Sequence, residues 1–76
     1  MIRIRFKQLL DDKGFKERRR ISVSEVVNES GVSQTTLSRI ANTPGYNARL
    51  DAIDALCKYF GCTPGELLEY VDETPE

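Results

Sequence analysis

The chain has 76 residues, of which 39% are hydrophobic and 30% are charged, and its formal net charge is −1. These values are typical of one globular domain and atypical of a disordered chain, and no apolar run approaches the roughly 20 residues that a membrane span needs. We therefore expect a single domain over residues 1–76 that is cytoplasmic, carries no signal segment and has no membrane partner.

Residue chemistry argues against an enzyme or a metal protein. The chain has no histidine and no glycine-rich phosphate loop, so we expect no catalytic residues and no cofactor. Its two cysteines supply too few ligands for a structural zinc site. We expect Cys57 in the core and Cys62 partly covered, and a local disulfide between them remains the alternative.

Charge is distributed unevenly along the chain. Residues 1–49 hold ten Lys or Arg against five Asp or Glu, whereas residues 50–76 hold one Lys against seven acids. Such polarity allows one face to attract a polyanion while the other stays solvated.

The N-terminal residues predict a short strand followed by a helix. Ile2, Ile4 and Phe6 alternate with arginines, which is the period of a strand. Its partner would be residues 67–71 or the same segment of a second subunit. The helix that starts near Phe6 is expected to end at Gly14. Residues 16–20, "KERRR", then form a basic connection, either a solvated loop or a loop that contacts phosphate.

Three further helices follow, with clear start and stop signals. Ser22 and Glu25 predict a capping box at the start of the second helix, and Gly31 predicts its end. Ser33 caps the third helix, which runs to about Ala41. After a turn rich in Asn, Pro and Gly, the fourth helix covers about Arg49 to Phe60 and ends at Gly61. The residues expected to be buried are Val23, Val26 and Val27 in the second helix and Leu50, Ile53, Leu56, Cys57 and Phe60 in the fourth.

A fifth helix has the strongest start signal in the chain. Thr63 is the expected N-cap, Pro64 the first helical residue and Glu66 the acid of a capping box. Leu67, Leu68 and Val71 are its expected buried residues, and residues 72–76 form a frayed acidic tail. The prediction is a compact all-α domain of five helices with a short N-terminal strand.

Helices two and three are separated only by "GVS", which is typical of a helix-turn-helix over about residues 22–41. The outer face of the third helix carries amide, hydroxyl and guanidinium groups and no acid. These groups read base edges in the major groove of DNA, where Gln can pair with adenine and Arg with guanine. The expected base-facing residues are Gln34, Thr35, Ser38 and Arg39. An ion pair of Arg39 with an acid such as Glu29 is the structural alternative.

Two segments resemble the Cro/C1-type (XRE, lambda-repressor-like) helix-turn-helix regulators: "ISVSEVVNESGVSQTTLSRIAN" and "LDAIDALCKYFGCTPGELLEY". The resemblance implies a lambda-repressor-like five-helix bundle whose recognition helix is residues 34–41. The sequence departs from the family pattern at Val23, where Gln is common, and at Val27, where Ala is usual. The resemblance implies DNA-backbone contacts near the recognition helix. The basic connection of residues 16–20 offers one further backbone contact. The expected backbone contacts are Ser33, Thr36, Asn42, Arg49 and Arg19.

The function expected from these features is a sequence-specific DNA-binding transcriptional regulator, acting as a repressor. Because one helix contacts only a few base pairs, we expect a homodimer on a palindromic operator. The fifth helix with Tyr70 and Val71, or the N-terminal segment, is the expected dimer surface. No effector ligand is evident. The alternative is a protein-interaction or antitoxin-like module of the same fold with weak DNA binding.

Overall fold

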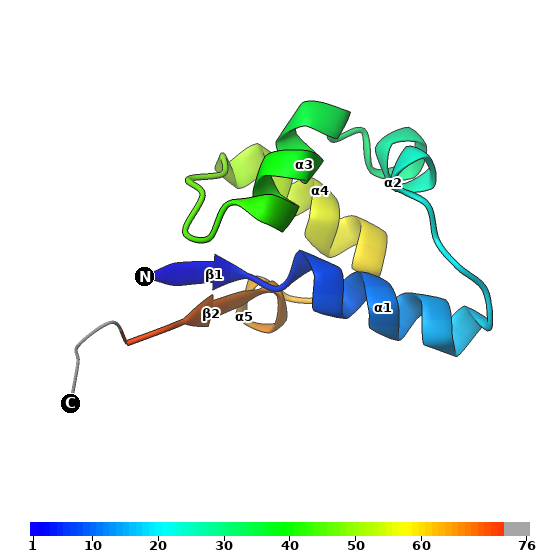
Figure 1. Ribbon diagram of the computed structural model, residues 1–76, viewed down its shortest axis with the longest axis horizontal. Coiled ribbons are helices and arrows are strands. Elements are labelled where there is room, and N and C mark those ends of the chain that lie inside the picture. The colour runs from blue at the N-terminus through cyan, green and yellow to red at the C-terminus, as the bar shows by residue number, and fades with distance from the viewer. Residues whose placement is uncertain (73–76) are drawn as a thin grey trace.

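The structure is a computed structural model that describes residues 1–72. Two short strands and five helices follow one another along the chain (Figure 1). Their bounds are β1 Ile2–Ile4, α1 Phe6–Glu17, α2 Val23–Ser30, α3 Gln34–Asn42, α4 Leu50–Phe60, α5 Pro64–Leu67 and β2 Leu68–Tyr70. The five helices and the N-terminal strand expected from the sequence are confirmed.

The core is built from one fully buried side chain of each helix. These residues come from distant parts of the chain and pack in a single cluster with the buried residues Ile21, Val32, Ile40 and Ile53. Since each helix is too short to be stable alone, its burial in this cluster is what holds it in place. The five fully buried residues are Phe6, Val26, Leu37, Leu56 and Leu67.

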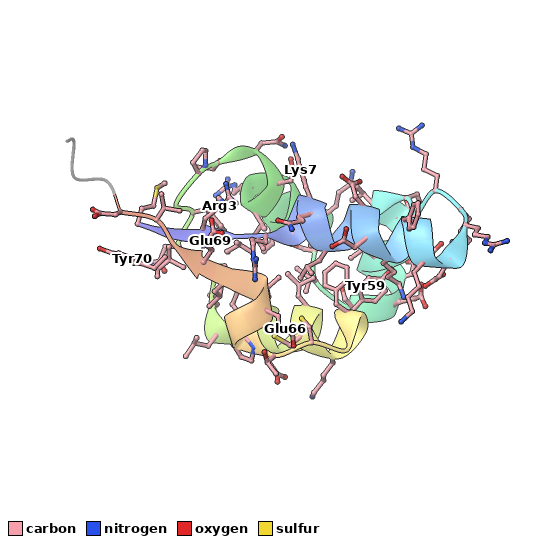
Figure 2. The ribbon with its side chains drawn as sticks, turned by 90° about the horizontal axis from the view of Figure 1, so that it is seen from below. Arg3, Lys7, Tyr59, Glu66, Glu69 and Tyr70 are labelled. Atoms are coloured by element: carbon pink, nitrogen blue, oxygen red, sulfur yellow. The ribbon has the colours of Figure 1, made fainter. Side chains whose placement is uncertain are left out.

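The two ends of the described chain meet in an antiparallel sheet. Ile2 lies opposite Tyr70 and Ile4 opposite Leu68, while Arg3 lies opposite Glu69 and forms a 2.9 Å ion pair with it (Figure 2). The partner of β1 is therefore the C-terminal segment, which is the first of the two partners expected.

This pairing shortens the fifth helix. The capping box of Thr63 and Glu66 is present as predicted. The expected helical path through Val71 is wrong, because the chain turns extended at Leu68 and pairs with β1. The Leu68 N–H donates to the carbonyl of Pro64 as the helix ends. Leu67 is fully buried, while Leu68 and Val71 are only half-buried.

Gly14 does not end the first helix, contrary to expectation. The helix continues to Glu17 and ends at Arg18, which adopts a left-handed conformation with φ 57°. Gly14 is needed for another reason: the Arg19 N–H donates to its carbonyl, and a Cβ on Gly14 would lie 2.9 Å from the Arg19 oxygen. The chain thus folds back across the helix at the one position without a side chain.

Two residues expected to be buried are exposed. Val23 is 41% exposed and Leu50 is 83% exposed. Both are the first residues of their helices, so the apolar period is correct but the first turn extends past the core. Cys57 and Cys62 are both half-buried against the core, and both are free thiols.

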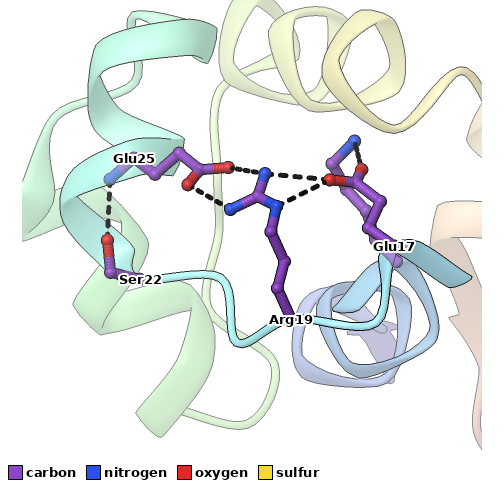
Figure 3. A network of polar contacts seen from close by, with 5 residues as sticks. Glu17, Arg19, Ser22 and Glu25 are labelled. Carbon is purple, nitrogen blue, oxygen red and sulfur yellow. Dashed lines mark hydrogen bonds and ion pairs between the residues drawn. The ribbon is translucent and has the colours of Figure 1, made fainter. Parts of the chain in front are cut away.

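An ion-pair network joins α1 to α2 (Figure 3). Arg19 donates two hydrogen bonds to Glu25, at 2.7 and 2.6 Å, and its Nε lies 3.0 Å from Glu17. Lys13 is 2.7 Å from Glu17. Ser22 accepts from the Glu25 N–H as predicted, but the Glu25 carboxylate binds Arg19 instead of completing the capping box. The expected capping box is therefore half formed.

We expect Leu67→Ala to lower the free energy of unfolding by about 2–5 kcal/mol, because it leaves a cavity where the helices converge. Leu50→Ala is the matched control: an exposed leucine should cost within about 0.5 kcal/mol. Urea denaturation followed by circular dichroism measures both. Equal losses in the two variants would contradict the described core.

The Arg19 hydrogen bonds hold the pKa of Glu25 below its ordinary value of 4.5. Lys13 and, secondarily, Arg19 lower the pKa of Glu17 in the same way. Because the folded pKa values lie below the unfolded ones, this stabilisation is present above pH 4.5 and is lost as pH falls through the folded values. Arg19→Gln should flatten that acid-sensitive part of the stability profile, whereas Arg20→Gln should leave it unchanged. Thermal melts between pH 3 and 6 compare them.

Candidate nucleic-acid interface

The α2–α3 connection is fixed by local bonds. Gly31 takes φ 80° and its N–H donates to the Val27 carbonyl, which closes α2. The Ser30 hydroxyl donates to the Val26 carbonyl and accepts from the Val32 N–H. Because Val32 is itself buried, the turn is anchored at its centre. The short glycine-containing connection thus sets α3 rigidly against α2, as a helix-turn-helix requires.

Helix α3 has one buried face and one open face. Leu37 and Ile40 are buried in the core. The four residues expected to face bases occur at helical spacing on the other side, and all are exposed: Gln34, Thr35, Ser38 and Arg39. No ion pair within residues 1–72 involves Arg39, so the alternative pairing with Glu29 does not occur there.

The start of α3 offers a set of hydrogen-bond donors. Ser33 is the N-cap: its hydroxyl accepts from the Thr36 N–H and donates to the Thr36 hydroxyl at 2.9 Å. The cap uses the third helical N–H, so the N–H groups of Gln34 and Thr35 remain available at the positive end of the helix dipole. This is a favourable environment for an anion.

Arg49 lies beside this helix start. It is the N-cap of α4 and makes only a loose 3.7 Å contact with Asp51. Ser33, Thr36 and Arg49 line the same groove of about 260 Å³, together with Tyr46. The structure thus brings together three of the five residues expected to contact the DNA backbone.

Asn42 lies at the other end of α3, away from those three. Its amide donates to the Ser38 carbonyl at 2.9 Å and lies 3.4 Å from the Ser38 hydroxyl. These contacts hold the side chains of Ser38 and Asn42 together on the last turn of the helix. The amide oxygen of Asn42 is not used by these bonds and remains an acceptor.

A second groove, of about 330 Å³, runs from Asn42 to the start of α1. Arg3, Lys7 and Gln8 lie on its far side. Arg3 is held by Glu69, but no ion pair within the described chain involves Lys7, which is exposed (Figure 2). Sequence reasoning missed Lys7, because nothing in the sequence places the first helix beside the end of the third.

The fifth expected backbone contact, Arg19, lies elsewhere. The α1–α2 connection is at the opposite end of α1 from β1 (Figure 1). The Arg19 guanidinium faces Glu25 and Glu17, and its hydrogen bonds with Glu25 and, secondarily, with Glu17 raise its pKa further above its ordinary value. A phosphate at this position would have to share these donors with two carboxylates.

Val23 occupies the first position of α2 and is partly exposed. An apolar side chain there cannot donate a hydrogen bond, which the Gln common at this position can.

Within residues 1–72 no cluster of three or more potential metal ligands occurs. None of the helices in the same range is both long and apolar enough to cross a membrane.

Comparison with known proteins agrees with this geometry. Residues 13–73 match the family described as the Cro/C1-type HTH DNA-binding domain. The chain is 36% identical over 53 residues to an "Uncharacterized HTH-type transcriptional regulator YozG" of Bacillus subtilis (strain 168). The alignment covers 70% of this chain and 63% of that relative, so the chain spans less than two thirds of the relative's length. No match was found among solved structures. Since the family match includes α2 to α5, the chain belongs to the Cro/C1-type helix-turn-helix DNA-binding family.

Proposed function

We propose that the protein is a sequence-specific regulator of transcription that inserts α3 into the major groove of DNA. The observation that carries this proposal is the open face of α3. It presents amide, hydroxyl and guanidinium groups, it contains no acid, and no ion pair within residues 1–72 neutralises its arginine. A helix that served only stability would carry acids on this face as often as bases.

Four residues read bases in this proposal. Gln34 is suited to a bidentate contact with adenine and Arg39 to one with guanine. Ser38 is suited to a single hydrogen bond, with its orientation supported by Asn42. Thr35 offers both a hydroxyl and a methyl group, and the latter can contact thymine.

The DNA backbone is contacted on both sides of α3. At the helix start, Ser33 and Thr36 with the free N–H groups bind one phosphate, and Arg49 extends this site across its groove. At the helix end, Asn42 contacts the other strand, and we add Lys7 to the residues expected from the sequence. In the α1–α2 connection, Arg20 is a freer cation than Arg19, because its guanidinium has no ion pair within the described residues.

We infer that two copies bind a palindromic operator, with half-sites about one helical turn (roughly 34 Å) apart. One α3 contacts too few base pairs to be selective in a genome, and pairing two half-sites multiplies the selectivity. Repression is the outcome we propose, since occupying a promoter requires only the DNA binding that this domain provides.

Selection of bound sites from random double-stranded DNA tests the proposal. We expect enrichment of an inverted repeat, with affinity that falls steeply as salt increases. Enrichment of a single short site without symmetry would contradict the dimer but not the role of α3. Binding that is undetectable at low salt would contradict the regulator and favour a protein-interaction module.

Arg39→Ala should reduce affinity for the selected operator by about 1–3 kcal/mol, because it removes a bidentate base contact. Affinity for random DNA should change much less, so the ratio of specific to non-specific binding falls. Fluorescence anisotropy with both DNAs measures this ratio. An unchanged ratio would contradict the assignment of α3 as the reading helix.

Lys7→Ala and Arg49→Ala should each weaken binding to all sequences alike. Each should also reduce the slope of log K against log salt by about 0.9, the value for one released phosphate contact. Lys58→Ala is the matched control, since this exposed lysine pairs with Asp54 on α4 and lines neither groove. A slope that Lys7→Ala leaves unaltered would remove Lys7 from the interface.

A further inference from the structure

Strand β2 has one hydrogen-bonded edge and one open edge. The Met1 ammonium donates to the Val71 carbonyl and the Val71 N–H to Met1, while the Arg5 N–H donates to Leu67. Hydrogen-bonded pairs alternate in an antiparallel ladder, so Arg3 and Glu69 form the pair between these two. The N–H and C=O of Tyr70 therefore point away from β1. Within residues 1–72 no other strand lies on that edge.

The apolar residues at this end of the sheet are unusually exposed. Ile2 is 50% exposed and Tyr70 is 74% exposed, although they are direct neighbours in the sheet. Both side chains are on one face, since Arg3 and Glu69 occupy the other. Tyr70 points outward from the end of β2 (Figure 2). An open strand edge beside exposed apolar side chains is a template for pairing with another strand.

The other edge of the sheet is not equally accessible. β1 lies between β2 and the loop that follows α3 (Figure 1). A Cβ built on Gly45 of this loop would lie 2.9 Å from the sulfur of Met1, so the loop packs directly against the start of β1. The same loop and β1 line the groove that we assign to DNA. The edge of β2 is thus the free one.

We propose that β2 pairs antiparallel with β2 of a second copy of this chain, with Tyr70 at the two-fold axis, to give a continuous four-stranded sheet. The inference rests on the proposed homodimer and names its surface. A two-fold interface brings the same patch of both subunits together, so the patch must complement itself. The question is therefore in which register β2 is complementary to a second copy of itself.

Of the registers with Glu69 or Tyr70 at the two-fold axis, the backbone favours the second. With Glu69 at the axis, Leu68 would have to donate to Tyr70 of the second copy, but its N–H is already bound to Pro64. That register would also place two Glu69 carboxylates opposite each other, which is destabilising. With Tyr70 at the axis, the two copies of Tyr70 exchange N–H···O=C bonds, and Glu69 faces Val71.

The favoured register also completes the apolar row. In it Ile2 and Tyr70 of one copy continue into Tyr70 and Ile2 of the other, so the exposed side chains of the sheet cover one another. Directly opposed aromatic residues, here the two copies of Tyr70, are among the stabilising pairs of antiparallel sheets. The interface is small, so we expect a dimer that dissociates on dilution and that a palindromic DNA reinforces.

Analytical ultracentrifugation of the full chain over a range of concentrations tests the surface. We expect the wild type to dimerise and Tyr70→Glu to stay monomeric at the same concentrations, because it opposes two carboxylates at the axis. Leu50→Glu is the matched control: it charges an apolar residue on α4 that is even more exposed than Tyr70, and it should leave the dimer intact. Unchanged circular dichroism and melting temperature of Tyr70→Glu would show that the fold survives.

Amide exchange measured by NMR tests the register. The Tyr70 amide should be protected at high protein concentration and exchange faster on dilution. The Glu69 amide, which faces Arg3 within one copy, should be protected at every concentration. A dimer in which the Tyr70 amide exchanges freely, or one that Tyr70→Glu does not dissociate, would overturn this surface.

The outcome for DNA binding separates this inference from the proposed function. Tyr70→Glu should bind a single half-site as the wild type does and lose only the extra affinity for the full palindrome. A wild-type chain that remains monomeric yet binds one half-site specifically would overturn the dimer and leave the role of α3 standing. A wild-type chain that dimerises through Tyr70 but shows no specific DNA binding would overturn the proposed function alone.

Discussion

The open face of α3 depends on the packing of Leu37 in the core. This packing places α3 in the same core cluster as fully buried side chains from the four other helices, so the position of the open face depends on that core. α3 has only nine residues, too few to be helical in isolation. Its exposed serine and threonine side chains add little helix propensity. The proposed recognition surface is therefore only as rigid as the core cluster beneath it.

Loop segments complete the surface at both ends of that helix. The turn before α3 is closed by Ser30 and Val32, and the loop after it packs against Met1. The two grooves proposed to face DNA thus lie where α3 meets the start of α4 on one side and the start of α1 on the other. Arg49 and Lys7 bring positive charge to these grooves, so the proposed interface combines segments far apart in sequence.

Local signals predicted most of the fold, and long-range contacts explain the rest. Helix caps and terminating glycines act within one turn of backbone, so they can be predicted from the local sequence alone. These are the caps at Ser22, Ser33 and Thr63 and the glycines Gly31 and Gly61. Gly14 and residues 68–70 were misread because their conformation depends on Arg19 and on β1. At Val23, apolar spacing indicated burial, whereas the resemblance to a family with Gln there already indicated an exposed position. Lys7 could not be found, because its place beside Asn42 exists only after folding.

Pairing β1 with β2 also sets an order of assembly. These strands are the first and last elements of the described chain, and Leu67, the final member of the core, directly precedes β2. During synthesis the strand edge at Tyr70 leaves the ribosome after α2 and α3. Bringing β1 and β2 together closes a loop of more than 60 residues, and the conformational entropy lost is offset only when the late core contacts form. In the proposed dimer, two nascent chains therefore cannot join through β2 before α3 of each chain has been synthesised.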